Sequence, residues 1–383
     1  MIPAKRIHTV EEYYFSRKLR EVRSLIAAGK PIVNLGIGSP DLQPPTVVVD
    51  ALEASLHDDT AHKYQSYQGI PELRNAIASF YKNNYKVTLN ADTEVLPLMG
   101  SKEGIMHISM AYLDEGDEVL IANPSYPTYT SVTKLLGAIP IYYNLDANNN
   151  WLPNLEELEQ QDLSKVKLMW VNYPHMPTGA KATRTFFEKL IAFAKKHQIL
   201  IINDNPYSFI LNDEPMSILS IEGAKEVALE LNSLSKSFNM AGWRTGMVMG
   251  KATHIQHVLK VKSNMDSGMF YGIQKGAIKA LASSKDWFTE LNKIYAKRRQ
   301  LIWQLATKLN CTFSTETAGM FVWAKLPKEN TLSSEAFIDK LLYEKNVFIT
   351  PGSIFGTQGE GYIRFSLCVT EEKIKEVINR IEA

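Results

Sequence analysis

Short apolar runs of strand length alternate with segments of helical spacing from about Thr93 to Lys262, and this alternation is the strongest constraint on the fold. The expected strands are Glu94–Met99, Glu118–Ala122, Ile139–Tyr143, Val166–Val171, Ile199–Asn203, Val227–Asn232 and Thr245–Met249. The expected helices are Lys102–Tyr112, Tyr129–Leu136, Thr183–Lys196 and Ala252–Lys262. Because strands and helices that alternate in this way form a parallel sheet covered by helices on both faces, we predict an α/β fold.

The C-terminal part of the chain has a mixed α+β order instead. The expected elements are a helix near Trp287–Leu309, two strands within Thr312–Leu326, a helix at Ser334–Lys345, a strand at Tyr362–Cys368 and a helix from Glu371. A chain of 383 residues is long enough for two or three domains. We expect an N-terminal arm (1–45) that contributes to a small domain, a large domain (46–280) and a small C-terminal domain (281–383). The Pro-rich segment Ser39–Pro45 is the candidate linker, since adjacent prolines force extended backbone.

Charge and composition favour chemistry on small molecules. Lys plus Arg exceed Asp plus Glu by one, so the chain lacks the basic surface that nucleic-acid binding requires. Its two cysteines, Cys311 and Cys368, lie far apart in sequence, which fits a reducing compartment. We find neither a signal-peptide pattern nor an apolar stretch approaching the roughly 20 residues that span a bilayer. The expected location is therefore the cytoplasm, with no membrane partner.

The ends of the predicted strands are where ligands bind in a parallel α/β sheet. Gly100–Gly104 is a turn of small residues that leads into a helix, with a hydroxyl from Ser101 and an ammonium from Lys102. Free N–H groups at a helix start, together with these side chains, favour binding of a phosphate. The order of residues is not that of a Walker motif, and an ordinary capped helix start is the alternative.

Three polar or aromatic residues follow other strands in the same way. Tyr126 is either a ring that stacks on a flat ligand or a half-buried loop tyrosine. Asn172 opens the loop that ends at Gly179. Asp204 ends an apolar strand. Burial of a charged carboxylate there would destabilise the fold unless a nearby cation compensates the charge.

The segment Ser233–Arg244 follows a further apolar strand and combines three hydroxyls, Lys236 and Arg244. The guanidinium of Arg244 suits a phosphate, and a lysine among cations in a dry site becomes a nucleophilic amine. Ser233 to Lys236 also matches the S-x-x-K signature of serine acyl-enzymes. That alternative fails because the S-D-N and K-T-G partners are absent from the sequence.

The run Ser-Leu-Ser-Lys-Ser-Phe-Asn-Met-Ala-Gly-Trp-Arg-Thr-Gly, from Ser233 to Gly246, closely resembles the cofactor-lysine signature of the class I/II aminotransferases. These are pyridoxal-phosphate (PLP) enzymes of fold type I, and the resemblance extends from about Pro31 to the C-terminus. It implies a three-layer αβα large domain with a mainly parallel sheet that binds PLP, and a smaller α+β domain.

The resemblance also implies the roles of the catalytic residues. Lys236 matches the lysine that forms the Schiff base with the cofactor and shuttles the proton during transamination. Asp204 matches the aspartate that pairs with the protonated pyridine nitrogen. Tyr207 matches the tyrosine that bonds the phenolic oxygen of the cofactor ring.

The remaining binding residues follow from the same resemblance. Tyr126 matches the aromatic residue that stacks on the ring, and Asn172 is a further candidate for binding the cofactor. Arg364 matches the arginine that grips the substrate α-carboxylate, and Gly38 lies in a loop that the family places over the substrate. The residues that match the phosphate-binding set are Ser101, Lys102, Ser233, Ser235 and Arg244.

The resemblance further implies a homodimer with shared active sites. Tyr64 is similar to a tyrosine that reaches the phosphate bound by the neighbouring subunit. The segment Asn264–Gly268 resembles an interface stretch of the family.

One position departs from the family pattern, which has asparagine just before Pro-Thr-Gly, where this chain has Met176. A thioether cannot donate a hydrogen bond to the phenolic oxygen of the cofactor. Tyr207 then acts alone, or Asn172 or His175 reaches the oxygen, or the enzyme catalyses another PLP reaction such as carbon–sulfur β-elimination.

The predicted function is that of an amino-acid:2-oxo-acid aminotransferase acting in two half-reactions. The alternatives are a PLP-dependent carbon–sulfur β-lyase and a weakly catalytic PLP-binding regulator. Four aromatic residues are candidates for an apolar side-chain pocket, with plain packing as the alternative: Tyr13, Tyr14, Phe15 and Phe270. No metal is expected, because the His254 and His257 pair lacks a third ligand nearby in sequence.

Overall fold

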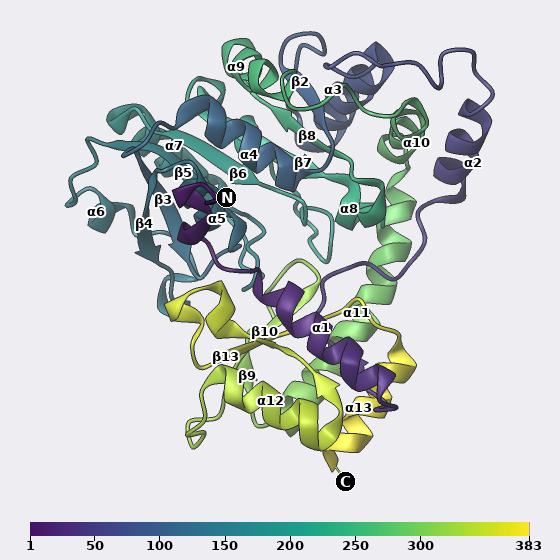
Figure 1. Ribbon diagram of the computed structural model, residues 1–383, viewed down its shortest axis with the longest axis vertical. Coiled ribbons are helices and arrows are strands. Elements are labelled where there is room, and N and C mark those ends of the chain that lie inside the picture. Colours follow the sequence, from purple (N-terminus) through teal and green to yellow (C-terminus); the bar gives the residue numbers. More distant parts are fainter. Residues whose placement is uncertain (383) are drawn as a thin grey trace.

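The computed structural model describes residues 1–382, and its largest feature is a seven-stranded sheet (Figure 1). Across the sheet the strands are β2 (Val95–Leu98), β8 (Gly246–Met249), β7 (Ala228–Ser233), β6 (Leu200–Asp204), β5 (Val166–Val171), β3 (Glu118–Asn123) and β4 (Ile139–Asn144). Strand β8 is antiparallel to both of its neighbours, and the other adjacent pairs are parallel. The prediction of a mainly parallel sheet is confirmed, and each strand lies within one residue of its expected bounds.

Helices cover both faces of this sheet. Those that the sequence predicted are α4 (Ser101–Tyr112), α5 (Thr128–Leu135), α7 (Arg184–His197) and α9 (Ala252–Lys262). Those that it did not predict are α2 (Thr46–Ser55), α3 (Pro71–Tyr85), α6 (Leu155–Leu158), α8 (Leu234–Ser237) and α10 (Tyr271–Leu281). Short 3₁₀ turns occur at η1 (Lys5–Thr9), η2 (Ala147–Asn149), η3 (Ile218–Ser220), η4 (Ala224–Glu226), η5 (Ala241–Trp243), η6 (Gly352–Phe355) and η7 (Thr357–Gly359).

The three layers are held together by apolar side chains that alternate along the strands. In β3, Leu120 is buried in the core shared with α3, α7 and α10, whereas Val119 and Ile121 are buried in the core shared with α4 and α9. Full burial of one such side chain stabilises the fold by about 1.5–3 kcal/mol relative to exposure. Because both faces of the sheet are buried, these strands appear in the sequence as unbroken runs of apolar residues.

A second, smaller core lies below the large sheet in Figure 1. Its antiparallel sheet has the order β12 (Thr350–Pro351), β13 (Tyr362–Ser366), β10 (Phe321–Lys325) and β9 (Thr312–Phe313). Its helices are α11 (Lys285–Lys308), α12 (Ser334–Lys345) and α13 (Glu371–Glu382). The long helix α11 joins the two cores, because Phe288 packs in the upper one and Ile302 in the lower one.

The N-terminal segment packs against this smaller core. Helix α1 (Tyr14–Ala27) contributes Val22, and β1 (Val33–Asn34) pairs in parallel with β11 (Val347–Phe348). We propose that the chain divides into an arm (1–45), a large domain (46–280) and a small domain (281–383). The last residue of the small domain, Ala383, lies outside the residues that the structure describes. The Pro-rich segment Ser39–Pro45 joins β1 to α2 without a helix or strand of its own.

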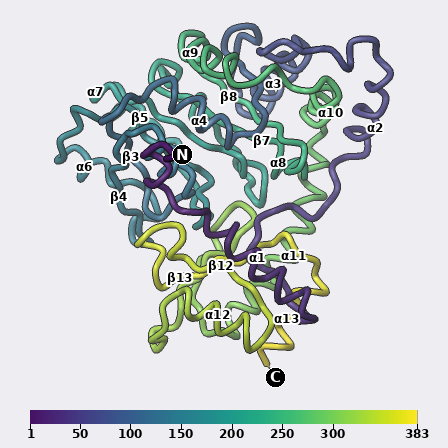
Figure 2. The backbone as a smooth tube through the Cα atoms, viewed as in Figure 1, coloured from purple at the N-terminus to yellow at the C-terminus, as the bar shows by residue number. Residues whose placement is uncertain are grey.

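The backbone course places three distant parts of the chain around one point (Figure 2). These parts are the loops after β5, β6 and β7, the N-terminal segment from Tyr13 to Ser39, and the residues Phe321, Phe355 and Arg364 of the C-terminal part. None of the helices within residues 1–382 has both the length and the apolar composition needed to cross a membrane.

Candidate functional site

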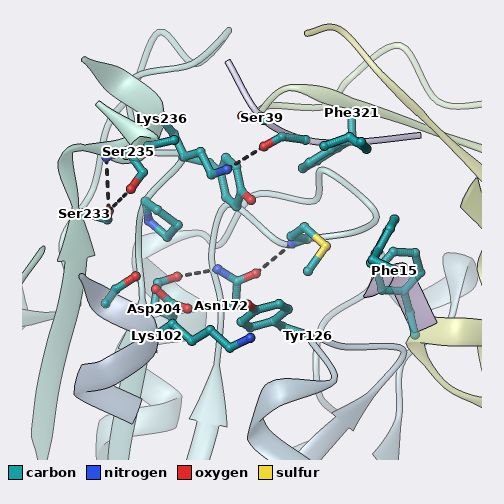
Figure 3. A pocket seen from close by; sticks show the side chains of 18 of the residues that line it. Phe15, Ser39, Lys102, Tyr126, Asn172, Asp204, Ser233, Ser235, Lys236 and Phe321 are labelled. Atoms are coloured by element: carbon teal, nitrogen blue, oxygen red, sulfur yellow. Dashed lines mark hydrogen bonds between the residues drawn. The ribbon is translucent and has the colours of Figure 1, made fainter. Parts of the chain in front are cut away.

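A cavity of about 390 Å³ lies between the two cores, at the carboxyl ends of the parallel strands. The predicted site residues that line it are Gly38, Ser101, Lys102, Tyr126, Asn172, Asp204, Tyr207, Ser233, Ser235, Lys236, Arg244 and Arg364. Figure 3 shows Ser233 and Ser235 at one end of the cavity, Phe15 at the other, and Lys236 between them.

The end with the serines is built to hold an anion. Gly100 has a positive φ of 97°, and a Cβ there would lie 2.4 Å from a terminal nitrogen of Arg244, so the close approach of this guanidinium requires glycine. Helix α4 begins next to it at Ser101, which leaves N–H groups at the helix start available to a ligand. The hydroxyl of Ser233 donates to that of Ser235 over 2.8 Å. Hydroxyls, N–H groups and a cation therefore converge, as phosphate binding requires.

Asp204 supplies a buried carboxylate that, among residues 1–382, a single side chain satisfies. The Tyr129 hydroxyl donates to its Oδ2 over 2.7 Å, whereas Oδ1 is buried and has no hydrogen-bond partner among residues 1–382. Burial raises the pKa of the Asp204 carboxyl to about 6, against the opposing effects of the Tyr129 hydrogen bond and the Lys236 charge. The free oxygen is suited to a cationic N–H from a ligand.

Lys236 lies in the same cavity with its amine in an environment that disfavours the charged form. Its Nζ donates to the carbonyl oxygen of Gly38 over 2.6 Å. Burial lowers the pKa of Lys236, as do the charges of Arg364 and Arg244, while Cys368 and Asp204 act in the opposite direction. The amine is therefore nearer to its neutral, nucleophilic form than an exposed lysine.

Two tyrosines complete the central part of the cavity. Tyr207 is buried, its ring meets that of Phe321 edge-on at 5.8 Å between centroids, and burial raises the pKa of its hydroxyl. Tyr126 meets Tyr129 edge-on at 5.6 Å between centroids. Both side chains can offer a hydroxyl to a ligand in the cavity.

Arg364 carries its charge in an aromatic environment. Its Nη2 donates to the Gly36 carbonyl over 2.8 Å, and its guanidinium carbon lies 4.0 Å from the centre of the Phe321 ring and 4.8 Å from that of Phe355. Burial lowers the pKa of Arg364 to about 10, so the group stays charged at neutral pH. A buried cation with few protein acceptors is suited to a carboxylate.

Met176, which occupies the position where the family pattern has asparagine, contacts Arg364 directly. The Nη1 of Arg364 lies 3.2 Å from the Met176 sulfur. Asn172 lines the cavity, but its amide already donates to the Asp204 carbonyl and its carbonyl accepts from the Met176 N–H. His175 is outside the cavity lining within the described chain and bonds Thr178 instead. Of the two suggested substitutes for the missing asparagine, only Asn172 is within the cavity.

The sequence missed several residues of the site. Tyr129, which orients Asp204, is stacked on Trp170 at 4.8 Å between centroids. The other lining residues that were not predicted are Leu19, Ile37, Ser39, Pro206, Ala241, Phe321 and Phe355. Of the four aromatic candidates, Tyr13 and Phe15 line the cavity, while Tyr14 and Phe270 do not in the part that the structure describes.

Tyr64 lies outside the cavity. It is 90% exposed and lines a shallow surface hollow formed by two segments, His62–Gln65 and Ser267–Phe270. A Cβ at Gly268 would lie 2.5 Å from the Gln65 carbonyl oxygen, so these segments pack tightly side by side. Tyr64 therefore projects away from the site of its own chain.

Two clusters have side chains of the kinds that bind metals. His254 and His257 both contact the Tyr112 hydroxyl, at 2.6 and 3.3 Å. Glu103, His107 and Asp266 bring ligand atoms within 4.8 Å of one another, but the Lys262 ammonium lies 2.8 Å from Asp266 and already neutralises it. We assign a metal to neither cluster.

The residues of the cavity fit pyridoxal phosphate, the cofactor that the sequence implies. The anion-binding end suits the phosphate, the free Oδ1 of Asp204 suits a protonated pyridine nitrogen, and Lys236 offers an amine of lowered pKa.

A family model described as aminotransferase class I and II matches residues 30–381. An LL-diaminopimelate aminotransferase of Maridesulfovibrio salexigens is 41% identical over 381 residues, which covers 99% of this chain and 98% of the relative. One from Dehalococcoides mccartyi is also 41% identical, over 380 residues that cover 99% of this chain and 97% of the relative.

Solved structures are similar along nearly the whole chain. The apo structure of BacF from Bacillus subtilis superimposes with a TM-score of 0.96 at 36% identity, covering 100% of this chain and 98% of that one. The aromatic aminotransferase of Pyrococcus horikoshii superimposes with a TM-score of 0.87 at 29% identity, covering 94% and 97%.

Proposed function

The chain belongs to the class I and II aminotransferases and is a PLP-dependent enzyme of amino-acid metabolism, and we propose that the cavity around Lys236 carries out its amino transfer between an α-amino acid and a 2-oxo acid. The observation that carries this proposal is the presence in one cavity of an anion-binding end, a free buried carboxylate oxygen, a lysine of lowered pKa and a buried arginine. Each matches one part of the cofactor or the substrate.

Residues from several loops and helix starts would hold the cofactor. The start of α4 with Ser101 and Lys102, the serines at 233 and 235, and Arg244 would bind the phosphate. Asp204 would accept the pyridine N–H, with Tyr129 fixing the orientation of the carboxylate. Tyr207 would bond the phenolic oxygen, and Tyr126 would lie against the ring. When bound, the cofactor withdraws electrons from the substrate α-carbon.

The protein's own groups would move the proton and orient the substrate. The lowered pKa of Lys236 keeps its amine available to take a proton from the α-carbon and return one to the cofactor carbon C4′. Arg364 would bind the α-carboxylate and so fix the α-carbon near Lys236.

Replacing Arg364 by alanine is expected to lower kcat/KM for the amino acid by roughly 10²- to 10³-fold, because a buried charged partner of the carboxylate is lost. The effect should appear mainly in KM, and the absorbance of the bound cofactor should stay unchanged, since Arg364 is not among its proposed ligands. Steady-state kinetics measure this, with Arg184→Ala, an exposed arginine at the start of α7, as control. A normal KM would remove Arg364 from the substrate site.

Replacing Met176 by asparagine is expected to lower, by about one unit, the pH midpoint at which the absorbance of the bound cofactor changes. An amide donor to the phenolic oxygen favours its ionised form, so the proton that it shares with the lysine leaves at lower pH. Spectrophotometric titration measures the midpoint. Met176→Leu, which keeps the volume without a donor, should leave it in place. Equal midpoints in the Asn and Leu variants would show that position 176 does not reach this oxygen.

A homodimer with shared sites is part of the proposal. Large exposed apolar side chains lie in the two segments that form the hollow around Tyr64, or within two residues of them: Tyr64, Tyr67, Met265 and Phe270. A surface of this kind supports an interface between copies of the chain, across which Tyr64 would reach the partner's phosphate. We also propose a cytoplasmic location, consistent with two buried, unpaired cysteines.

The names of the relatives make LL-diaminopimelate a candidate amino donor for this chain. The comparisons do not favour the carbon–sulfur lyase or the non-catalytic regulator.

The test of the proposed function is transfer of labelled nitrogen. With ¹⁵N-labelled amino acid and a 2-oxo acid such as 2-oxoglutarate, all of the label should appear in the new amino acid, with one oxo acid formed per amino group moved. Release of the label as ammonia without an acceptor would contradict it in favour of a lyase.

A further inference from the structure

Residues 35–41 form a loop, the glycine loop, that contacts two of the charged groups on which the proposed reaction depends. The carbonyl oxygen of Gly38 accepts a hydrogen bond from Nζ of Lys236 over 2.6 Å. The carbonyl oxygen of Gly36 accepts one from Nη2 of Arg364 over 2.8 Å. The position of this loop therefore bears on both the amine that would move the proton and the guanidinium that would bind the substrate.

The glycine loop packs against aromatic rings of the C-terminal part of the chain, with no room for side chains at its two glycines. A Cβ at Gly36 would lie 2.7 Å from the Phe348 ring, and a Cβ at Gly38 would overlap the Phe321 ring. Figure 3 shows the next residue, Ser39, on the same side of the cavity as Phe321. Because these contacts are so close, a shift of the loop has to move the rings or open a gap beside them.

An ion pair fastens the C-terminal end of the glycine loop. The guanidinium of Arg298, in α11, donates from Nη1 and Nη2 to the two carboxylate oxygens of Asp41, over 2.7 and 2.9 Å. Its Nη1 also donates to the carbonyl oxygen of Leu367, just after β13, over 3.0 Å. The Arg298 side chain is 4% exposed and that of Asp41 is 27% exposed. A bidentate pair fixes orientation as well as distance, so Asp41 is held in one place relative to α11 and to the end of β13.

The chain between Asp41 and Gly38 is short and stiff. Only Ser39 and Pro40 separate them. The ring of Pro40 fixes one backbone dihedral of that residue, and its bulk disfavours the helical conformation at Ser39. An anchor at Asp41 therefore limits where the carbonyl groups of the glycine loop can lie.

We propose that Asp41 and Arg298 are a positioning pair for the reaction. By fixing the glycine loop, the pair holds the Gly36 carbonyl against Arg364 and so keeps its guanidinium oriented toward the substrate α-carboxylate. The proposal rests on the function proposed above and adds two residues that act through Arg364. Neither side chain of the pair belongs to the cavity lining within residues 1–382.

The first test is steady-state kinetics of Asp41→Asn, which keeps the size of the side chain and removes its charge. Both substrates carry an α-carboxylate, so we expect KM for the amino acid and for the oxo acid to rise by about 5- to 20-fold, with kcat changed by less than about threefold. The matched control is Asp92→Asn, which breaks an ion pair with the buried Arg74 away from the cavity and should change neither constant. Native KM values in Asp41→Asn would overturn the proposal.

A double-mutant cycle tests whether the pair acts through Arg364. In the Arg364→Ala background, Asp41→Asn should change kcat/KM by less than about twofold, because the group that the loop orients is already gone. The same fold-change in both backgrounds would show that the ion pair acts independently of Arg364, which contradicts the proposal.

A third measurement needs neither cofactor nor turnover. In the cofactor-free protein the N–H groups of Gly36 and Ile37 donate to Oδ1 of Asn34, over 2.9 and 3.2 Å. Hydrogen exchange of a peptide that covers residues 35–41 should be at least about tenfold faster in Asp41→Asn than in the native protein or in Asp92→Asn. Equally faster exchange throughout residues 281–382 would make the role of the pair a general structural one and overturn the assignment.

A second variant covers a failure of Asp41→Asn to fold. Arg298→Lys keeps the charge but loses the bidentate geometry, so it should raise both KM and the exchange of the glycine loop, each by a smaller factor. Native values of both in this variant would count against the pair. Failure of the proposed function looks different, because then the native protein itself would transfer no amino group.

Discussion

Replacing Lys236 by alanine is expected to lower transamination by at least about 10⁴-fold, because the variant loses both the covalent anchor of the cofactor and the base that moves the proton. The bond that links cofactor and enzyme and that borohydride reduces should disappear as well. Turnover is measured with the same amino acid and oxo acid pair as for the native protein. The side chain is half-buried and its amine contacts only the Gly38 carbonyl in the described structure, so we expect the fold to survive the change.

The matched control is Lys251→Ala. Lys251 pairs with Glu226 at the protein surface and is not part of the cavity lining in residues 1–382. Its replacement should leave turnover and the reducible link intact. Transamination by the Lys236 variant at a near-native rate would contradict the assignment of this lysine as the catalytic residue that binds the cofactor.

Replacing Asp204 by asparagine is expected to have opposite effects on activity and on the stability of the cofactor-free protein. Activity should fall by about 10³-fold or more, because an amide cannot compensate the protonated pyridine nitrogen. Without cofactor, the carboxylate is buried beside a single hydroxyl donor, and burial raises its pKa to about 6 from the ordinary value of 3.8.

The sign of the stability effect follows from this raised pKa. The folded state binds the proton more tightly than the unfolded state, so ionisation of Asp204 destabilises the cofactor-free fold as pH rises from about 4 through 6, by about 3 kcal/mol in full. An asparagine side chain at this position carries no charge, so the variant does not lose this free energy of unfolding as the pH rises. At pH 7.5 the cofactor-free Asp204→Asn protein should therefore melt above the native one, and at pH 4 the difference should vanish. A native protein that melts higher at pH 7.5 would show that Asp204 is paired within the chain.

The sequence predicted most of the large sheet and most of the site because both depend on local pattern. Burial on both faces forces apolar runs such as Val166–Val171, and ligands bind at the ends of such strands. The motif around Lys236 packs several functional residues into one short segment, so a single stretch of sequence identified them together.

What the sequence missed depends on tertiary packing. Tyr129 orients Asp204 only because β5 brings Trp170 beneath its ring, and nothing near position 129 indicates this. Tyr14 and Phe15 are neighbours in sequence, but successive residues of a helix point about 100° apart, so only Phe15 lines the cavity. Helix α3 was missed although Pro71 at its first turn is a recognisable start signal.

The central claim is that Lys236 is the residue that binds the cofactor covalently in this cavity. The most direct measurement is reduction of the PLP-loaded protein with borohydride, followed by digestion and mass spectrometry of the peptides. We predict one added cofactor mass per chain, located on Lys236 within the peptide that spans Ser233–Arg244. The same mass on Lys102, or on no lysine of the cavity, would contradict it.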